Sequence, residues 1–296
     1  MRHKNAAQKG VLHRDISSGN ILITGNQDRG KRGVLIDFDN ACNLNNYNSA
    51  PDDPSTGTRA FMSSEILTKS EMKLLGNIQM GASSAPVAAK PIVGHLPVHD
   101  LEAFFWVLVY FCISREGPAR RRAELSQEPS ADTKPLVRHF TGLFAAESDL
   151  FLSDKKQNVW NSDAVAQKSI MHNVSRRTAP LIPLIAKMYR LLKHAYTTRL
   201  FDNLHDAIIE AFDEAEVELS NLPADEDPIL LKHIASLREA EEERRRRKDM
   251  SGQGDIQSPS NKAMPTASAS TFWTALPQLP QPHDSPSRPS KRVKTG

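Results

Sequence analysis

The chain has 296 residues, with 38 Lys and Arg against 35 Asp and Glu, and a formal net charge of +3. This length gives room for one sizeable domain with additional segments, and so small a net charge makes a nucleic-acid partner unlikely on this ground. The two cysteines, Cys42 and Cys112, are too few for a disulfide framework, and the first ten residues contain no apolar run typical of a secretory signal, so we expect an intracellular protein.

Short apolar runs near the start predict β-structure. The stretch from Val11 to Thr24 has the pattern of strand, loop and strand, and Val34 to Ile36 is a further β-rich run. A polar turn bounded by glycines, Gly25 to Gly33, joins the second and third runs and predicts a β-hairpin. From Asn40 to Ser64 the chain is rich in Asn, Ser, Asp, Pro and Gly, which predicts a loop.

Helical patterns dominate the rest of the chain. Val98 to Ile113 is almost wholly apolar after Asp100, but its apolar run is shorter than the ~20 residues needed to cross a bilayer, so we expect a buried core helix and no membrane. After a polar, Arg-rich insert at Gly117 to Pro135, helical apolar spacing returns at Ala179 to Tyr196 and at Asn203 to Leu219.

The C-terminal part is polar. Ile229 to Lys248 ends in three glutamates followed by basic residues, which predicts a charged helix with Glu–Arg pairs four residues apart. Asp249 to Gly296 is rich in Ser and Pro and too poor in apolar residues to fold, so we expect disorder. The expected organisation is therefore a lobe over residues 1–222, a charged helix over 223–248 and a tail over 249–296.

A basic cluster lies at the end of this tail. Lys291, Arg292 and Lys294 follow Pro289 in a segment that is not expected to fold. Short basic runs of this kind are typical of nuclear-import signals. We therefore expect a nuclear import receptor as a possible partner, and a nuclear or cytoplasmic location.

One motif near the start carries chemistry. His13-Arg14-Asp15 and Asn20 form the pattern H-R-D-x-x-x-x-N between two apolar runs. An aspartate and an asparagine five residues apart on a tight loop can serve the same phosphate. In such a position an aspartate can take the proton of a hydroxyl, and an asparagine carbonyl can bind Mg²⁺.

Three further motifs follow in order. They are Asp37-Phe38-Asp39, the segment Gly57-Thr58-Arg59-Ala60-Phe61-Met62-Ser63-Ser64-Glu65, and His99-Asp100-Leu101-Glu102-Ala103-Phe104-Phe105-Trp106. Together with the first motif they resemble the large C-terminal lobe of a protein kinase, and most closely that of the fungal-type protein kinases. The resemblance covers residues 11 to about 113.

The resemblance implies an α+β, mainly helical fold in which a short β-hairpin carries the catalytic loop and a central helix is buried. It implies transfer of the ATP γ-phosphoryl group to a protein Ser/Thr hydroxyl. Asp15 would be the base, in the His13-Arg14-Asp15 motif, and Asn20 and Asp37 would hold Mg²⁺ and the nucleotide.

Supporting roles are implied in the same way. Asp100 would cap the central helix and accept hydrogen bonds from the catalytic-loop backbone. Glu65 would need a buried arginine partner, for which Arg199 is a candidate. Arg14 would either clamp a phosphate on the segment before Glu65 or pair with a carbonyl or an acid. Candidate phosphate acceptors in that segment are Tyr47, Ser49, Ser55, Thr56 and Thr58.

Several features depart from the family pattern. The sequence ahead of His13 contains neither a G-x-G-x-x-G loop nor a lysine on a strand to pair with the α- and β-phosphates. Ser17 occupies the position of a lysine that contacts the transferred group, and Asp39 replaces a glycine, which removes freedom to adopt positive φ.

We therefore expect this chain by itself to be inactive. The alternatives are a binding module built on a kinase lobe and, with less support, a small-molecule kinase of the aminoglycoside type. The segment from Gly57 to Glu65, typical of enzymes that act on peptides, argues against the latter.

Overall fold

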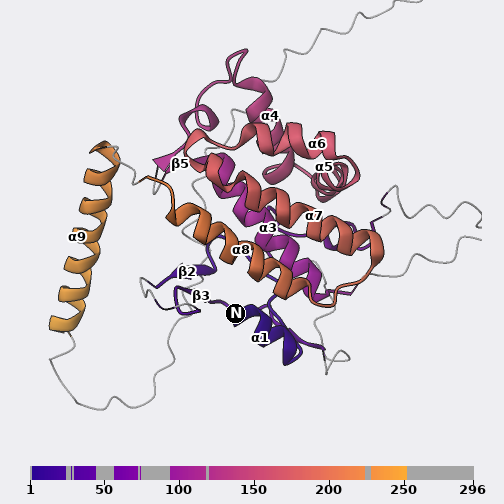
Figure 1. Ribbon diagram of the computed structural model, residues 1–296, viewed down its shortest axis with the longest axis horizontal. Helices are drawn as coiled ribbons and strands as arrows, with labels where there is room; N and C mark the ends of the chain where they lie inside the picture. The colour runs from indigo at the N-terminus through magenta and orange to yellow at the C-terminus, as the bar shows by residue number, and fades with distance from the viewer. Residues whose placement is uncertain are drawn as a thin grey trace, which may run out of the picture. The chain divides into compact units, whose positions relative to one another are not determined.

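The computed structural model describes residues 2–24, 28, 30–44, 57–72, 74, 94–117, 120–223 and 228–251. The chain divides into two compact units, residues 1–236 and residues 237–296. The described part is mainly helical with a few short strands, which confirms the expected α+β class (Figure 1).

The longer elements have the following bounds. The helices are α1 (Arg2–Gln8), α2 (Ser64–Thr68), α3 (Pro97–Ser114), α4 (Lys134–Phe144), α5 (Asp149–Asn161), α6 (Asp163–Ser169), α7 (Ile182–Thr198), α8 (Leu204–Ser220) and α9 (Pro228–Ser251). The strands are β1 (Val11–Leu12), β2 (Ile21–Ile23), β3 (Gly33–Leu35), β4 (Cys42–Asn43), β5 (Arg115–Gly117) and β6 (Arg120–Arg121). Short 3-10 helices lie at Ala123–Leu125, Met171–Asn173 and Arg176–Leu181.

The predicted hairpin is confirmed. Strands β2 and β3 pair antiparallel, with Ile21 opposite Leu35 and Ile23 opposite Gly33. Strand β1 pairs instead with β4, with Leu12 opposite Cys42. The segment between β1 and β2, which carries the H-R-D-x-x-x-x-N motif, is therefore anchored at both ends by backbone pairing.

Helix α3 forms the centre of the core. Pro97 occupies its first turn, where the fixed φ of proline suits helix entry and no backbone donor is lost. Most of its residues are buried, and its apolar character on every face is typical of a helix surrounded by others. It packs against α7 and the 3-10 helix that precedes α7, and α7 packs in turn against α8 (Figure 1).

Aromatic side chains hold the surrounding helices to α3. Trp160 of α5 lies 5.6 Å from Trp106 and stacks nearly parallel on Tyr189 of α7, with ring centroids 5.6 Å apart. Tyr196 of α7 packs on the same indole at 6.1 Å. Such pairs contribute about 0.5–1.5 kcal/mol each beyond their buried area.

Serine side chains set where three helices begin. The hydroxyl oxygens of Ser63, Ser148 and Ser162 accept hydrogen bonds from backbone amides in the first turns of α2, α5 and α6, respectively. Each bond satisfies a donor that the helix itself cannot, which contributes about 1 kcal/mol.

One expectation about bounds needs correction. The charged helix begins at Pro228 and ends at Ser251, so Asp249 to Ser251, predicted to belong to a disordered tail, are helical. Glutamates and arginines four residues apart support the helix near its end, where Arg247 pairs with Glu243. The rest of the tail, with Lys291, Arg292 and Lys294, lies outside the described residues.

Helix α3 is the one helix in the described ranges that is long and apolar enough to span a membrane by composition. Of the 18 residues of this helix, 72% are buried inside the structure. This burial agrees with the predicted role of the segment as a core helix.

Candidate functional site

Asp100 connects the core helix to the motif loop. Its carboxylate accepts hydrogen bonds from the backbone amides of His13 at 2.9 Å and Arg14 at 3.1 Å. The predicted contact between this aspartate and the catalytic-loop backbone is confirmed. Because Asp100 is buried in the rigid core, it fixes the position of the loop backbone.

The expected capping role of Asp100 is wrong. The helix starts after Leu96, and Asp100 is the fourth helical residue. The side chain that returns to the helix entry is His99, whose Nδ1 accepts a hydrogen bond from the backbone amide of Leu96 at 3.0 Å. Asp100 faces the loop and therefore serves a tertiary contact.

Two histidines complete the surroundings of Asp100. His3 donates from Nε2 to Oδ2 at 3.0 Å, and His95 donates from Nε2 to Oδ1 at 2.9 Å. Although burial acts in the opposite direction, these two hydrogen bonds hold the pKa of Asp100 below its ordinary value. Sequence reasoning missed both residues as partners of Asp100, because His3 precedes all four motifs, His95 lies between the third and the fourth, and no spacing rule joins them.

Asp15, the candidate base, is half-buried and oriented by the segment before Glu65. The backbone amide and the hydroxyl of Thr58 both donate to Oδ1, each at 2.8 Å. The other oxygen, Oδ2, has only a long contact of 3.5 Å with the Asn40 amide. One carboxylate oxygen is thus held in place, and the other is open to accept a proton from an incoming hydroxyl.

Gly57 allows Thr58 to come close to the Asp15 carboxylate. Its φ of +128° lies in a region that side chains rarely adopt, and a Cβ there would lie 2.7 Å from the carbonyl oxygen of Arg14. Glycine is therefore required for the segment to pass close enough for Thr58 to reach Asp15.

The hairpin brings Asn20 and Asp37 to the same end. The backbone amide of Ile36 donates to the carbonyl of Asn20 at 2.9 Å, so Asp37 follows the residue opposite Asn20. The side-chain nitrogen of Asn20 donates to the backbone carbonyl of Asp15 at 2.9 Å, which leaves its amide oxygen as an acceptor. Asp37 is exposed and adopts a φ of 63°.

These two side chains fit a magnesium ion. An amide oxygen and a carboxylate are the hard ligands that Mg²⁺ takes, and Mg²⁺ is commonly held by one or two protein groups together with phosphate oxygens. Within the described ranges no group of three or more His, Cys, Asp or Glu side chains could hold a metal ion alone.

His13 and Arg14 support the loop from within. The His13 ring donates from Nε2 to the carbonyl of Ile36 at 2.9 Å and lies edge-on to the Phe38 ring at 4.6 Å. Arg14 is buried, and its guanidinium hydrogen-bonds with the Cys42 thiol, whose pKa is raised by burial against the effect of Arg14. Of the candidate phosphate acceptors, only Thr58 lies in the described ranges.

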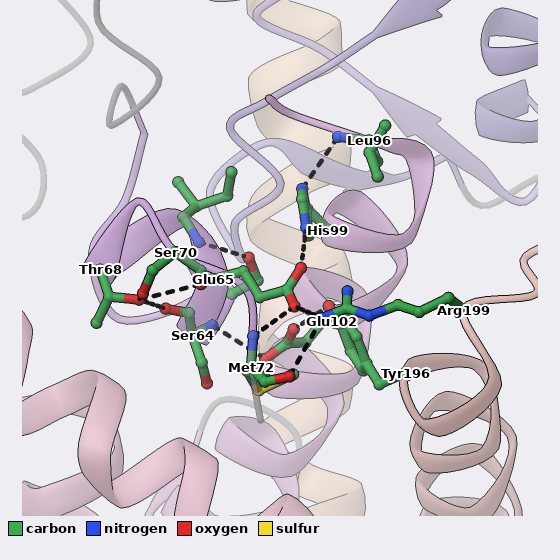
Figure 2. Close-up of polar contacts among 12 residues, drawn as sticks. Ser64, Glu65, Thr68, Ser70, Met72, Leu96, His99, Glu102, Tyr196 and Arg199 are labelled. Atoms are coloured by element: carbon green, nitrogen blue, oxygen red, sulfur yellow. Dashed lines mark hydrogen bonds and ion pairs between the residues drawn. The ribbon is translucent and has the colours of Figure 1, made fainter. Parts of the chain in front are cut away.

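Glu65 has the predicted arginine partner. Arg199 donates from Nη2 to Glu65 Oε1 at 2.6 Å, and His99 donates to Oε2 at 3.0 Å (Figure 2). The backbone amide of Met72 adds a hydrogen bond at 2.7 Å. Burial opposes the charge, yet these donors keep the pKa of Glu65 below its ordinary value. The pairing predicted from the sequence is confirmed.

A second buried acid lies beside it. Glu102 accepts hydrogen bonds from Trp106 Nε1 at 2.8 Å, from Trp160 Nε1 at 3.2 Å and from the Tyr196 hydroxyl (Figure 2 shows Glu102 with Tyr196). Lys156 lies 5.0 Å from the Trp106 ring centre, and its burial lowers its pKa to about 7. Lys156 donates to two backbone carbonyls, one of them Met62 at 2.6 Å.

Lys156 thereby ties α5 to the segment before α2, yet nothing in the sequence marked it. It lies on α5, in which the apolar residues do not recur with a helical period. Its burial becomes visible only when the helices are packed.

The motif loop is thus fixed to the buried central helix, and the Asp15 carboxylate is oriented by the segment before Glu65. Residues 2–112 match the family model described as fungal protein kinase. The match covers the part of the chain that carries the four motifs. No curated protein and no solved structure matches the chain.

Proposed function

We propose that this chain supplies the catalytic-loop part of a protein kinase-like phosphotransferase that moves the ATP γ-phosphoryl group to a protein Ser/Thr hydroxyl. The orientation of Asp15 is the observation that carries the proposal. Thr58 holds Oδ1 through two hydrogen bonds, while Oδ2 is left for a substrate hydroxyl. The family match supports the same class of function.

Each residue has a defined task in this proposal. Asp15 orients the acceptor hydroxyl and takes its proton. Asn20 and Asp37 hold Mg²⁺, which neutralises charge on the phosphate oxygens when bound. Asp100 and His13 position the loop and do not touch the substrate.

Nucleotide binding provides the direct test. Calorimetric titration of the full chain with ATP and Mg²⁺ should show weak binding that requires the metal. Asp37→Ala should abolish it, and Asn20→Ala should weaken it. Asp39→Asn is the matched control because Asp39 is an exposed acid next to the site to which we assign no metal contact. Affinity that survives Asp37→Ala or removal of Mg²⁺ would contradict the metal assignment.

Phosphotransfer tests the base. Labelled ATP and a generic protein substrate should give transfer near background with the chain alone, because its sequence ahead of His13 carries neither a phosphate-covering glycine loop nor an ATP-pairing lysine. Any transfer above background should fall by about 100-fold or more in Asp15→Asn, since a positioned base contributes roughly that much. Transfer unchanged in Asp15→Asn would remove Asp15 from the base role.

A binding module is the second candidate. The buried contacts of Asp100, Glu65 and Glu102 involve none of the residues assigned to the nucleotide, which supports a lobe whose packing does not require catalysis. Absence of both nucleotide binding and transfer, with the chain folded, would favour this function.

A further inference from the structure

A basic cavity lies far along the chain from the kinase motifs. It has a volume of about 700 Å³ and is formed by α4, α5 and α6. Figure 1 shows these three helices packed together. Its basic lining residues are Lys134, Arg138, His139, Lys155 and Lys168.

The positive charge converges from three helices. Lys134 and Arg138 are four residues apart and therefore share one face of α4. Lys155 comes from α5 and Lys168 from the last turn of α6. No aspartate or glutamate lines the cavity. These cations are thus gathered around one hollow instead of being spread along a single helix.

These cations have no acidic partners. In the described ranges, no ion pair joins Lys134, Arg138, Lys155 or Lys168 to a carboxylate. Lys155 instead lies over the Phe151 ring, with its Nζ 4.7 Å from the ring centre. By contrast, Lys187 and Lys193 of α7 are each paired with a carboxylate.

Nearby acids are engaged elsewhere. Asp163 at the start of α6 binds Lys193 at 2.5 Å and the Tyr189 hydroxyl at 2.8 Å. Asp154 accepts a hydrogen bond from the Asn158 side chain at 3.2 Å. The pKa of His139 is lowered by burial and by the charges of Lys168, Arg138 and Lys155, in agreement with an uncompensated positive field.

Apart from Asn158 and Ser169, the rest of the lining is apolar, and none of it is aromatic. It includes Pro135, Leu143, Ala164 and Val165. Bases of single-stranded nucleic acids stack on aromatic side chains, and His139 is the one ring in this lining. A concave site between helices is also poorly matched to a flat bilayer. Apolar walls with a cationic rim suit a short peptide that carries acidic groups around an aliphatic side chain.

We propose that this cavity is a docking site for an anionic segment of a partner protein, in which carboxylates or phosphates contact Arg138, Lys155 and Lys168 and an aliphatic side chain contacts Leu143 and Val165. Clusters of basic side chains recognise acidic and phosphorylated motifs in this way. The proposal does not depend on phosphotransfer, because no residue of the cavity belongs to the kinase motifs.

Fluorescence anisotropy with the full chain tests the proposal. The probes are a labelled peptide of alternating Glu and Asp around a central Leu, its phosphoserine counterpart, and the neutral Gln/Asn peptide. We expect the anionic peptides to bind, the neutral one not to bind, and binding to weaken with added salt because the contacts are electrostatic. The tighter of the two anionic peptides identifies carboxylate or phosphate as the natural group.

Variants locate the binding. Arg138→Gln combined with Lys168→Gln should weaken binding at least about tenfold, which corresponds to about 1.4 kcal/mol. The charge-matched control is Arg121→Gln combined with Arg190→Gln, two exposed arginines outside the cavity, and it should change the affinity less than about twofold. All four positions are exposed, so both proteins should fold, which a thermal melt verifies.

Three results would overturn the proposal. The first is equal weakening in both double variants, which would indicate general charge attraction. The second is equal binding of the neutral peptide. The third is tighter binding of single-stranded nucleic acid or of vesicles containing an anionic lipid, lost in Arg138→Gln/Lys168→Gln, which would assign the cavity to another class of partner.

Discussion

The carboxylate of Asp100 accepts a hydrogen bond from the backbone amide of His13 at 2.9 Å, across 87 residues of sequence. The same carboxylate accepts one from Arg14. Two buried backbone donors of the catalytic loop therefore have their partner on the central helix. The conformation of the loop therefore depends on the core. In turn, the buried Asp100 carboxylate depends on the loop amides for hydrogen bonds.

Asp100→Ala should destabilise the chain more than Asp15→Ala. Loss of the Asp100 carboxylate leaves two buried amides without an acceptor, which costs about 3 kcal/mol. Asp15 is half-buried, and without its carboxylate the two donors of Thr58 can hydrogen-bond to water. We therefore expect Asp15→Ala to lower the free energy of unfolding by about 1 kcal/mol or less. Urea denaturation compares the two, and Asp100→Asn, which keeps one oxygen, should fall between them. Equal losses would show that Asp100 does not anchor the loop.

Gly57→Ala should lower stability and disturb Asp15. The new Cβ would lie 2.7 Å from the Arg14 carbonyl oxygen at a φ of +128°, so a loss of about 2 kcal/mol is expected. Gly142→Ala is the matched control. Its Cβ would make an ordinary contact with Lys155 at 3.4 Å inside a helix, and stability should stay equal or rise by about 0.5–1 kcal/mol. Thermal melts that rank the two variants the other way would be inconsistent with the close approach.

Glu65 and Arg199 should be energetically coupled. A double-mutant cycle with Glu65→Gln and Arg199→Gln should give a coupling of about 1–3 kcal/mol, since the carboxylate is buried and the pair is joined at 2.6 Å. Denaturation of the four proteins measures it. Additive effects of the two substitutions would mean that the ion pair contributes nothing to stability.

Stability should fall as the pH drops below about 6.5. The pKa of His205 is lowered to about 4 by burial and by His3, and burial also lowers the pKa of His99. Between the ordinary histidine value of 6.5 and these lowered values, the unfolded chain binds protons that the folded chain does not, so acid favours unfolding. The lowered pKa values of Glu65 and Asp100 extend the loss to lower pH.

Urea midpoints measured between about pH 7.5 and pH 5 test this dependence. The midpoint should stay nearly level down to about pH 6.5 and decrease from there to pH 5. His205→Gln removes one of the titrating groups and should flatten the curve. A midpoint that does not change with pH would exclude these histidines as the cause.

We also propose that Lys291, Arg292 and Lys294 direct nuclear import. An extended basic segment can enter an acidic receptor groove when its own domain does not cover it, and the surrounding sequence is too polar to form a core. The full chain and a version ending at Pro289 are fused to a fluorescent protein and compared in cells. Loss of nuclear signal on truncation is expected, and identical distributions would refute the import signal.

Local patterns were sufficient for much of the fold. The hairpin of β2 and β3 follows from two β-rich runs around a glycine-bounded turn, and α3 follows from an apolar segment that begins at a proline. The resemblance implied an arginine partner for Glu65, and the candidate Arg199, which lies outside the motifs, is the residue that the structure pairs with it. The hairpin and α3 are carried by neighbouring residues alone.

Other features depended on packing. The expectation that Asp100 caps its helix failed because spacing gives its position in the first turn but not the direction in which its side chain points. The predicted end of α9 was also wrong. In a charged segment no change from apolar to polar residues marks where a helix ends.

The sequence by itself determined the kinase motifs, their order, and the residue types able to hold magnesium and accept a proton. Only the tertiary structure decided that His3 and His95 meet at Asp100, that Lys156 is buried beside Glu102, and that cations from α4, α5 and α6 surround one cavity. The physical reason is that local propensities act over a few residues. Charges and hydrogen-bond partners far apart in the chain acquire their energies only when packing excludes water and brings them together.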